Sequence, residues 1–291
     1  MLSLTEDPNT KLGPLGFVGD PVSKPLRIGM VREGLSGNRA VTDVDDALLS
    51  TAQLCESLGH HVEPTAWPFF GPAAIGAFLD EWMVLAASAV AATCAWIKCE
   101  ANTENFEPWT LGLASRGAAL LPDRIAGAVA QLTQAGRALD AFFETYDVLL
   151  SPVARHPPKL LGEHATDLPF DVLFERAVDN SDFTPLINAA GTPAMSVPLY
   201  WNGNGMPVGS ALRRSRGRGG DVIRLGLPAR SGAPLGRSLA ARELSDGCSV
   251  ASRSNDGPWS KAIGDLKRPA KRGESPGGSI TPLLEANQLT T

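Results

Sequence analysis

The sequence predicts an α/β fold followed by a long disordered tail. Three observations predict it: a strand–helix–strand pattern over residues 26–66, a continuous apolar strand at residues 146–153 after a long helix, and a sharp change in composition after residue 210. The chain has 291 residues, 43% of them apolar and 20% charged, which is typical of a soluble globular protein.

The pattern over residues 26–66 begins with the short apolar strand "LRIGMV". Thr42 and Asp45 fit a capping box that opens a helix. Apolar-face positions then recur at helical spacing: Val44, Leu48, Thr51, Cys55 and Leu58. Gly59 supplies a left-handed end, and "HVEP" starts the next strand. His60 and His61 lie at the turn between this helix and the next strand, and we expect them to be solvated rather than to bind a metal or another ligand.

The low-charge run "WMVLAASAVAATCAWI" (Trp82–Ile97) predicts a buried helix. It is short for a membrane span and follows two acidic residues, so no membrane partner is expected. We recognise no secretory signal. The four cysteines form no CxxC pair and no Cys/His ligand set, which indicates reduced thiols in a cytoplasmic protein and no metal site.

A second helix opens at Pro122-Asp123 and ends near Tyr146. Its predicted buried stripe consists of Ile125, Val129, Leu132, Leu139 and Phe142. The strand "YDVLLSPV" that follows is continuous in apolar residues, the type that is buried on both faces. His156 lies in the next loop and could act as a general base, but nothing in the sequence pairs with it.

The stretch "DFTPLINAAGTPAMSVPLYW" (residues 182–201) predicts a helix from Phe183 to Ala190 and then a strand. Gly191 ends the helix because glycine adopts the left-handed conformation without steric cost. Pro193 prevents the helix from continuing, and "AMSVPL" is the strand.

Charge divides the chain at residue 210. Residues 211–291 contain 11 Arg and 3 Lys against 7 acidic residues, a net charge of +7, and the remainder carries -12. The later part has Trp259 as its one aromatic residue and is rich in Gly, Ser and Arg. Such a stretch cannot bury enough apolar surface to offset its chain entropy. We therefore expect an N-terminal arm (1–25), a folded part (26–210) and a disordered tail (211–291).

Four segments in order resemble the amidase signature family: "LRIGMVREG", "CESLGHHVEP", "FFETYDVLLSPVARHPP" and "FTPLINAAGTPAMSVPLYWNGNGMPVG". The resemblance is to bacterial amidases of the 6-aminohexanoate-cyclic-dimer hydrolase type. It spans about residues 1–210 and only the later half of the family's domain. It implies part of a large mixed β-sheet covered by helices.

The resemblance also implies cleavage of carboxylic amide C–N bonds by a Ser nucleophile, a second Ser and a Lys, without metal or organic cofactor. The Lys and the Gly/Ser-rich motif belong to the half of the domain that precedes "LRIGMV". "SPGGS" (275–279) lies in the basic tail, in the wrong order. No catalytic residue is therefore assigned. The resemblance gives four candidates for the substrate pocket, each with core packing as the open alternative: Val178, Ser181, Phe183 and Pro185.

The family's last strand and helix are replaced here by "SALRRSRGRGGDVIRLGLPARSGAPLG". Suitable codons can be chosen for residues 227–236 such that, in a shifted reading frame, they encode a sequence like the end of the family's domain. We therefore hypothesise one inserted base near codon 210. Three functions follow as hypotheses: a truncated amidase inactive alone, a second subunit of a split amidase acting on a small-molecule amide, and nonspecific nucleic-acid or anion binding by the tail. The last is the weakest, because aromatic stacking platforms are absent from the tail. The oligomeric state stays open.

Overall fold

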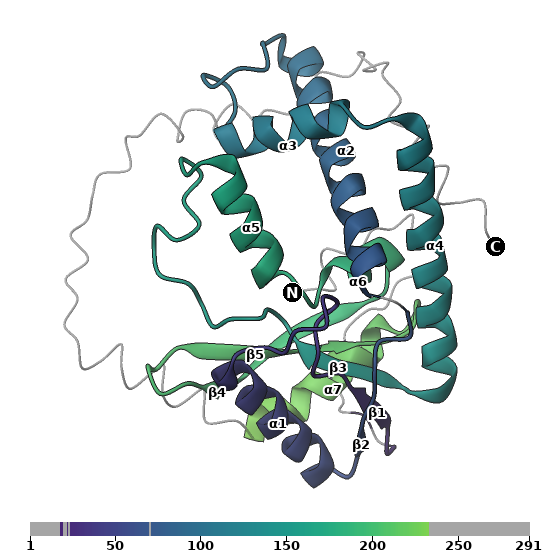
Figure 1. Cartoon of the computed structure of the whole chain (residues 1–291). Coiled ribbons are helices and arrows are strands. Elements are labelled where there is room, and N and C mark those ends of the chain that lie inside the picture. The colour runs from purple at the N-terminus through teal and green to yellow at the C-terminus, as the bar shows by residue number, and fades with distance from the viewer. Residues whose placement is uncertain (1–17, 20–21, 23, 70, 233–291) are drawn as a thin grey trace, which may run out of the picture. The chain divides into compact units, whose positions relative to one another are not determined.

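A computed structural model describes residues 18–19, 22, 24–69 and 71–232 (Figure 1). Its elements follow in chain order: β1 (Arg27–Met30), α1 (Thr42–Ser57), β2 (His61–Pro64), α2 (Gly71–Ile97), α3 (Pro108–Ala118), α4 (Pro122–Thr145), β3 (Val148–Pro152), α5 (Phe170–Asn180), α6 (Pro185–Ala190), β4 (Ala194–Trp201), β5 (Pro207–Arg213) and α7 (Gly219–Gly232).

The strands form one mixed sheet in the order β2-β1-β3-β5-β4. β1 is parallel to both β2 and β3, whereas β5 is antiparallel to β3 and to β4. β1, α1 and β2 are the strand–helix–strand unit expected from the sequence, so the predicted α/β class is confirmed.

Helices cover both faces of this sheet. On one face, α1 and α7 pack on a hydrophobic cluster that includes Leu48, Leu150 and Leu225. On the other face, α4 and α6 pack on a cluster that includes Leu139, Leu149 and Ile187. Every residue of β3 is buried. Side chains alternate along a strand, so Leu149 and Leu150 reach opposite layers, as a strand buried on both faces requires.

The predicted capping box of α1 is wrong. The N-cap is Val41, and no side chain caps the helix. Asp45 is ion-paired with Arg32 instead, with Nε to Oδ1 at 3.0 Å. Asp43 accepts a hydrogen bond from Asn202 Nδ2 at 2.9 Å. Both carboxylates therefore hold α1 to neighbouring segments rather than closing its first turn.

The other predicted boundaries of helices agree more closely. Gly59 and Gly191 are left-handed, with φ of 86° and 63°, and each follows a helix as expected. α6 begins at Pro185 because proline suits the first helical position. In α4 the predicted stripe is partly wrong: Val129 is 47% exposed, and the small residues Ala128 and Ala135 are buried instead.

The predicted burial of the Trp82–Ile97 helix is wrong, although the helix forms as part of α2. Leu85, Trp96 and Ile97 are 53%, 79% and 53% exposed. Among the described residues α2 is the one helix long and apolar enough to cross a membrane, and 22% of its most apolar window is buried. Asp80 nevertheless ties α2 to α4 by two 2.7 Å hydrogen bonds from Arg124.

An aromatic row joins α2 to α3 and α5. Trp82 packs edge-on against Trp109, with ring centroids 5.9 Å apart, and Trp109 stacks on Phe170 at 5.1 Å. The Arg116 guanidinium lies over the Phe170 ring at 3.6 Å from its centroid. These rings cover the side of α2 that faces α3, so the apolar side chains that stay exposed point elsewhere.

The expected boundary at residue 210 falls inside β5, and α7 follows. The arginines of "RRSRGRGG" (213–220) are engaged within the chain rather than presented as a basic patch. Arg213 and Arg214 are buried, Arg216 pairs with Asp140, and Arg218 pairs with Asp221. Residues 233–291, which carry the rest of the predicted tail and "SPGGS", lie outside the described residues.

His60 also differs from its prediction. It is 9% exposed rather than solvated, and its Nδ1 accepts a hydrogen bond from the backbone N–H of Leu26 at 3.3 Å. Burial lowers the pKa of His60, because it disfavours the imidazolium form. His61 is exposed as expected.

Candidate functional site

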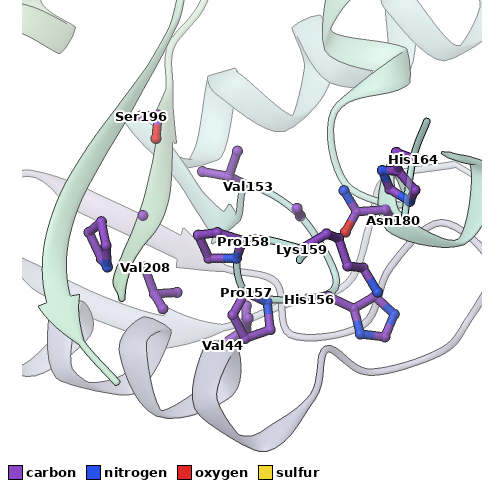
Figure 2. A pocket seen from close by; sticks show the side chains of 13 residues that line it. Val44, Val153, His156, Pro157, Pro158, Lys159, His164, Asn180, Ser196 and Val208 are labelled. Carbon is purple, nitrogen blue, oxygen red and sulfur yellow. The ribbon is translucent and has the colours of Figure 1, made fainter. Parts of the chain in front are cut away.

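A cavity of about 320 Å³ lies where the loop after β3 passes α1, the end of α5 and the β4–β5 hairpin (Figure 2). Val44, Val153 and Val208 supply apolar wall, and His156, Lys159, His164 and Asn180 supply polar groups. Mixed walls of this kind are typical of small-molecule sites, in which a few polar groups fix the ligand's orientation. This cavity is the candidate site.

His156 is paired with Asp179 across the loop. Its Nε2 lies 2.6 Å from Oδ2 of Asp179, and Arg155 donates to the other carboxylate oxygen. Burial alone would raise the pKa of Asp179, but the hydrogen bond from His156 and the charge of Arg155 outweigh it and lower that pKa. The carboxylate is thus held ionised, and it fixes the orientation of the imidazole.

The backbone of this loop is anchored on two sides. Arg155 N–H donates to the carbonyl of Asn180 at 3.0 Å, and Val41 N–H donates to the carbonyl of Arg155 at 3.0 Å. The first bond ties the loop to the end of α5, and the second ties it to the start of α1. His156 is therefore positioned by regular structure on both sides of the cavity.

Two atoms in the cavity wall keep hydrogen-bonding capacity. Nε2 of His164 and Oδ1 of Asn180 are buried and have no protein partner among the described residues. A buried polar atom without a partner costs about 1–3 kcal/mol. With the Lys159 ammonium on the same wall, the cavity favours a ligand that carries both hydrogen-bond donors and acceptors.

Ser196 borders the cavity from β4, apart from His156 in the view of Figure 2. A Cβ at Gly209 on the facing strand would lie 2.7 Å from its Oγ, so glycine leaves room for this hydroxyl. No hydrogen bond joins Ser196 to His156 or Lys159 in the described part of the chain. Ser196 thus has none of the activation that a nucleophilic serine requires.

The four pocket candidates suggested by the resemblance do not border this cavity. Phe183 is fully buried in the cluster with Val44 and Val208, and Pro185 is buried at the start of α6. Val178 is half-buried, and Ser181 is exposed. For Phe183 and Pro185 this environment matches the core-packing alternative.

Asp182 was missed by the sequence interpretation although it lies between two candidates. It is 4% exposed, and it accepts hydrogen bonds from the Ser36 backbone N–H at 2.8 Å and from the Ser36 hydroxyl at 2.6 Å. Burial raises its pKa, and the bonds from Ser36 partly oppose that shift. Ser36 is far away in sequence, so no local pattern signals the pair. Asp182 fixes the loop after β1.

Within the described residues, no group of three or more His, Cys, Asp or Glu side chains could hold a metal ion.

The sheet and its helices define an α/β protein with the fold of the amidase signature enzymes. Its fold is similar to that of 6-aminohexanoate cyclic dimer hydrolase (TM-score 0.65, 19% identity), covering 77% of this chain and 48% of the other. It is also similar to a bacterial aryl acylamidase of the amidase signature enzymes family (TM-score 0.61, 19% identity), covering 75% and 45%.

The amidase family model matches residues 17–218, and the chain belongs to this family. It is 31% identical over 229 residues to the putative amidase AmiC of Mycobacterium leprae (strain TN), and 32% identical over 230 residues to that of Mycobacterium tuberculosis (strain ATCC 25618 / H37Rv). Each alignment covers 79% of this chain and 48% of the relative. The chain thus spans about half the length of these curated relatives.

Proposed function

We propose that this chain forms the later half of an enzyme that hydrolyses carboxylic amide C–N bonds. It supplies part of the sheet and one wall of the substrate site, and the nucleophile is supplied by polypeptide outside this sequence. The family match over residues 17–218, on a chain that spans 48% of its relatives, carries this proposal. The polar wall of His156, Lys159 and Asn180 suits the polar atoms of an amide substrate.

The chain alone is expected to be inactive. An amide nitrogen leaves poorly, so a catalyst must first take a proton from the nucleophile and then return it to the leaving group. That role requires a base within hydrogen-bonding reach of a hydroxyl. Among the residues the structure describes, no lysine or histidine is hydrogen-bonded to a serine hydroxyl, and Nε2 of His156 faces the Asp179 carboxylate rather than a hydroxyl.

The exposed face of α2 favours a second candidate, in which the nucleophile-bearing half is a separate subunit. Leu85 and Trp96 lie on the same side of α2, eleven positions apart, and both are exposed, as is Ile97 at the end of the helix, although α2 is otherwise docked on α3 and α4. Large exposed apolar surfaces mark sites of protein association or membrane contact. The Asp80–Arg124 ion pair and the docking of α2 on two helices favour association with protein.

The experiment is to mix the purified chain with a polypeptide that spans the part of M. tuberculosis AmiC outside the region of similarity. Release of nitroaniline from a nitroanilide amide is measured for each chain and for the mixture. Hydrolysis by the mixture only is expected. A mixture that forms a stable complex but stays inactive would contradict the proposed chemistry, and hydrolysis by this chain alone would contradict its dependence on a second half.

A Leu85→Lys/Trp96→Lys variant tests the role of the α2 face in that mixture. This variant should no longer form the complex with the other half, and the mixture should therefore be inactive. Its circular dichroism spectrum should stay that of the folded chain. A Leu161→Lys variant is the matched control, because Leu161 is fully exposed on the loop after β3. Full assembly by the α2 variant would exclude α2 from the interface.

We also propose that the sequence beyond residue 210 is translated from a shifted frame. Arg213 supports this, because it is fully buried at the end of β5. It donates to Ser151 Oγ and, at 3.1 Å, to the carbonyl of Phe183, and no carboxylate pairs with it in the described region. Burial lowers its pKa to about 9. Resequencing the gene around codon 210 tests the proposal: a confirmed reading frame in an otherwise intact gene would contradict it.

A further inference from the structure

Cys94 and Cys99 lie together at the end of α2. Their Sγ atoms are 3.5 Å apart, and both side chains are partly exposed. No sequence pattern pairs them, because five positions separate them and neither belongs to a CxxC motif. In the structure they are the closest pair of sulfur atoms among the described cysteines.

The way in which α2 ends produces this contact. Lys98 follows Ile97, the last residue of the helix, and has a left-handed φ of 55°. The chain therefore turns back, and the backbone N–H of Cys99 donates to the carbonyl of Cys94 at 3.2 Å. This is the hydrogen bond of a Schellman motif, in which the side chains two positions beyond the helix and three before its end meet. Here both of those side chains are thiols.

We propose that Cys94 and Cys99 are a reversible dithiol site, which closes to an intrachain disulfide when it reacts with a small disulfide oxidant such as oxidised glutathione. One thiolate attacks a glutathione sulfur and releases one glutathione thiolate. The second thiolate attacks the resulting mixed disulfide and releases the other. Two protein thiols are thereby oxidised, and one glutathione disulfide is reduced to two thiols.

The two cysteines have different roles in this sequence. Burial raises the pKa of the Cys94 thiol, and the neighbouring Cys99 sulfur raises it further, because a second thiolate so close would be repelled. We therefore expect Cys99 to attack first and Cys94 to resolve the mixed disulfide. The remaining distance is short, since a disulfide requires about 2 Å between sulfurs and rotation of the two side chains can supply the difference.

The closed disulfide would fix the last turn of α2 beside its exposed apolar residues Trp96 and Ile97. The site thus offers a chemical control of the segment that carries the proposed interface. Formation of this disulfide requires only the geometry of the two thiols, so it does not depend on amidase activity.

The test uses the full chain with Cys55→Ser and Cys248→Ser, which leaves the proposed pair as its only thiols. After exposure to oxidised glutathione, free thiols are alkylated and the protein is digested with trypsin. Cleavage after Lys98 separates the two cysteines, so a peptide spanning 40–98 linked to one spanning 99–116 reports the disulfide. Linked peptides that separate on reduction are expected.

Two controls make the test specific to the structure. The Cys99→Ser variant should yield no linked peptides and should stop at a glutathione adduct on Cys94 or at the free thiol. In urea, pairing should slow by roughly tenfold, because the unfolded chain loses the preorganisation of the two thiols. Stable glutathione adducts on both cysteines, unreacted thiols, or equal rates with and without urea would each overturn the proposal.

In the unsubstituted protein, Cys55 provides an internal reference. It lies on the buried face of α1 and is 3% exposed, and burial raises the pKa of its thiol to about 11. Because the thiolate is the reactive form, Cys55 should stay unmodified in the folded chain. Loss of the free Cys55 thiol at the same rate as the other two would indicate unfolding rather than a dithiol site.

Discussion

At the scale of single residues, Arg213 puts a guanidinium where the sheet offers apolar neighbours. It pairs in register with Leu149, and its Nε has no hydrogen-bond partner among the described residues. Taking a charged group out of water costs several kcal/mol, and no carboxylate among the described residues offsets that cost for Arg213. Arg213→Leu should therefore raise the free energy of unfolding, measured by urea denaturation.

Arg216→Leu is the control for this substitution. Arg216 is 55% exposed and forms a surface ion pair with Asp140, so its loss should change the free energy of unfolding by less than about 1 kcal/mol. If Arg213→Leu destabilises the protein more than Arg216→Leu does, Arg213 is an adapted part of this core, and the frame-shift proposal loses its structural support.

The polar pairs of the site could not be predicted residue by residue. His156 and Asp179 are 23 positions apart, and Ser36 and Asp182 are 146 positions apart. Only the closed fold brings each pair together, so a single sequence shows an isolated histidine and an isolated aspartate. The family resemblance pointed to residues close to Asn180 in the chain, but none of those it selected borders the cavity.

At the scale of elements, the start of α1 separates two interpretations of the same residues. A capping box predicts that Thr42→Ala destabilises the protein by about 0.5–2 kcal/mol. In the structure Thr42 is an exposed residue inside the helix, and Val41 occupies the N-cap with an extended backbone. Thr42→Ala should therefore change the free energy of unfolding by less than about 0.5 kcal/mol.

Val41→Thr complements that experiment. Threonine keeps the branched shape that packs beside Val44, and its hydroxyl oxygen can accept a hydrogen bond from a free backbone N–H of the first turn. The substitution should therefore stabilise the protein by about 0.5–1 kcal/mol. Thermal and urea unfolding of both variants measure the effect. Destabilisation by Thr42→Ala together with no gain from Val41→Thr would restore the capping box.

Elements with a strong periodic pattern were predicted well from sequence, and their environments less so. β3 and α6 lie where the apolar run and the Gly191 stop placed them. An apolar helix pattern, however, does not show whether another element of the same chain packs against it. That is why Trp82–Ile97 was predicted to be buried and is instead largely exposed.

At the scale of the whole molecule, this exposed face of α2 is expected to govern how the isolated chain behaves. An apolar surface of this kind promotes association when no partner covers it. Sedimentation velocity of the isolated chain should show self-association that depends on concentration. The Leu85→Lys/Trp96→Lys variant should shift the population toward monomer, whereas Leu161→Lys, on the loop after β3, should leave it unchanged.

The same variants separate a protein partner from a lipid one. If α2 associates with protein, the isolated chain should not co-sediment with phosphatidylcholine/phosphatidylglycerol vesicles, and adding the other amidase half should suppress its self-association. Vesicle binding that the α2 variant loses would assign this face to a membrane instead. If both the unsubstituted chain and the α2 variant remain monomeric at high concentration, the exposed face of α2 does not drive association. The split-subunit proposal would then lose the observation that favours it.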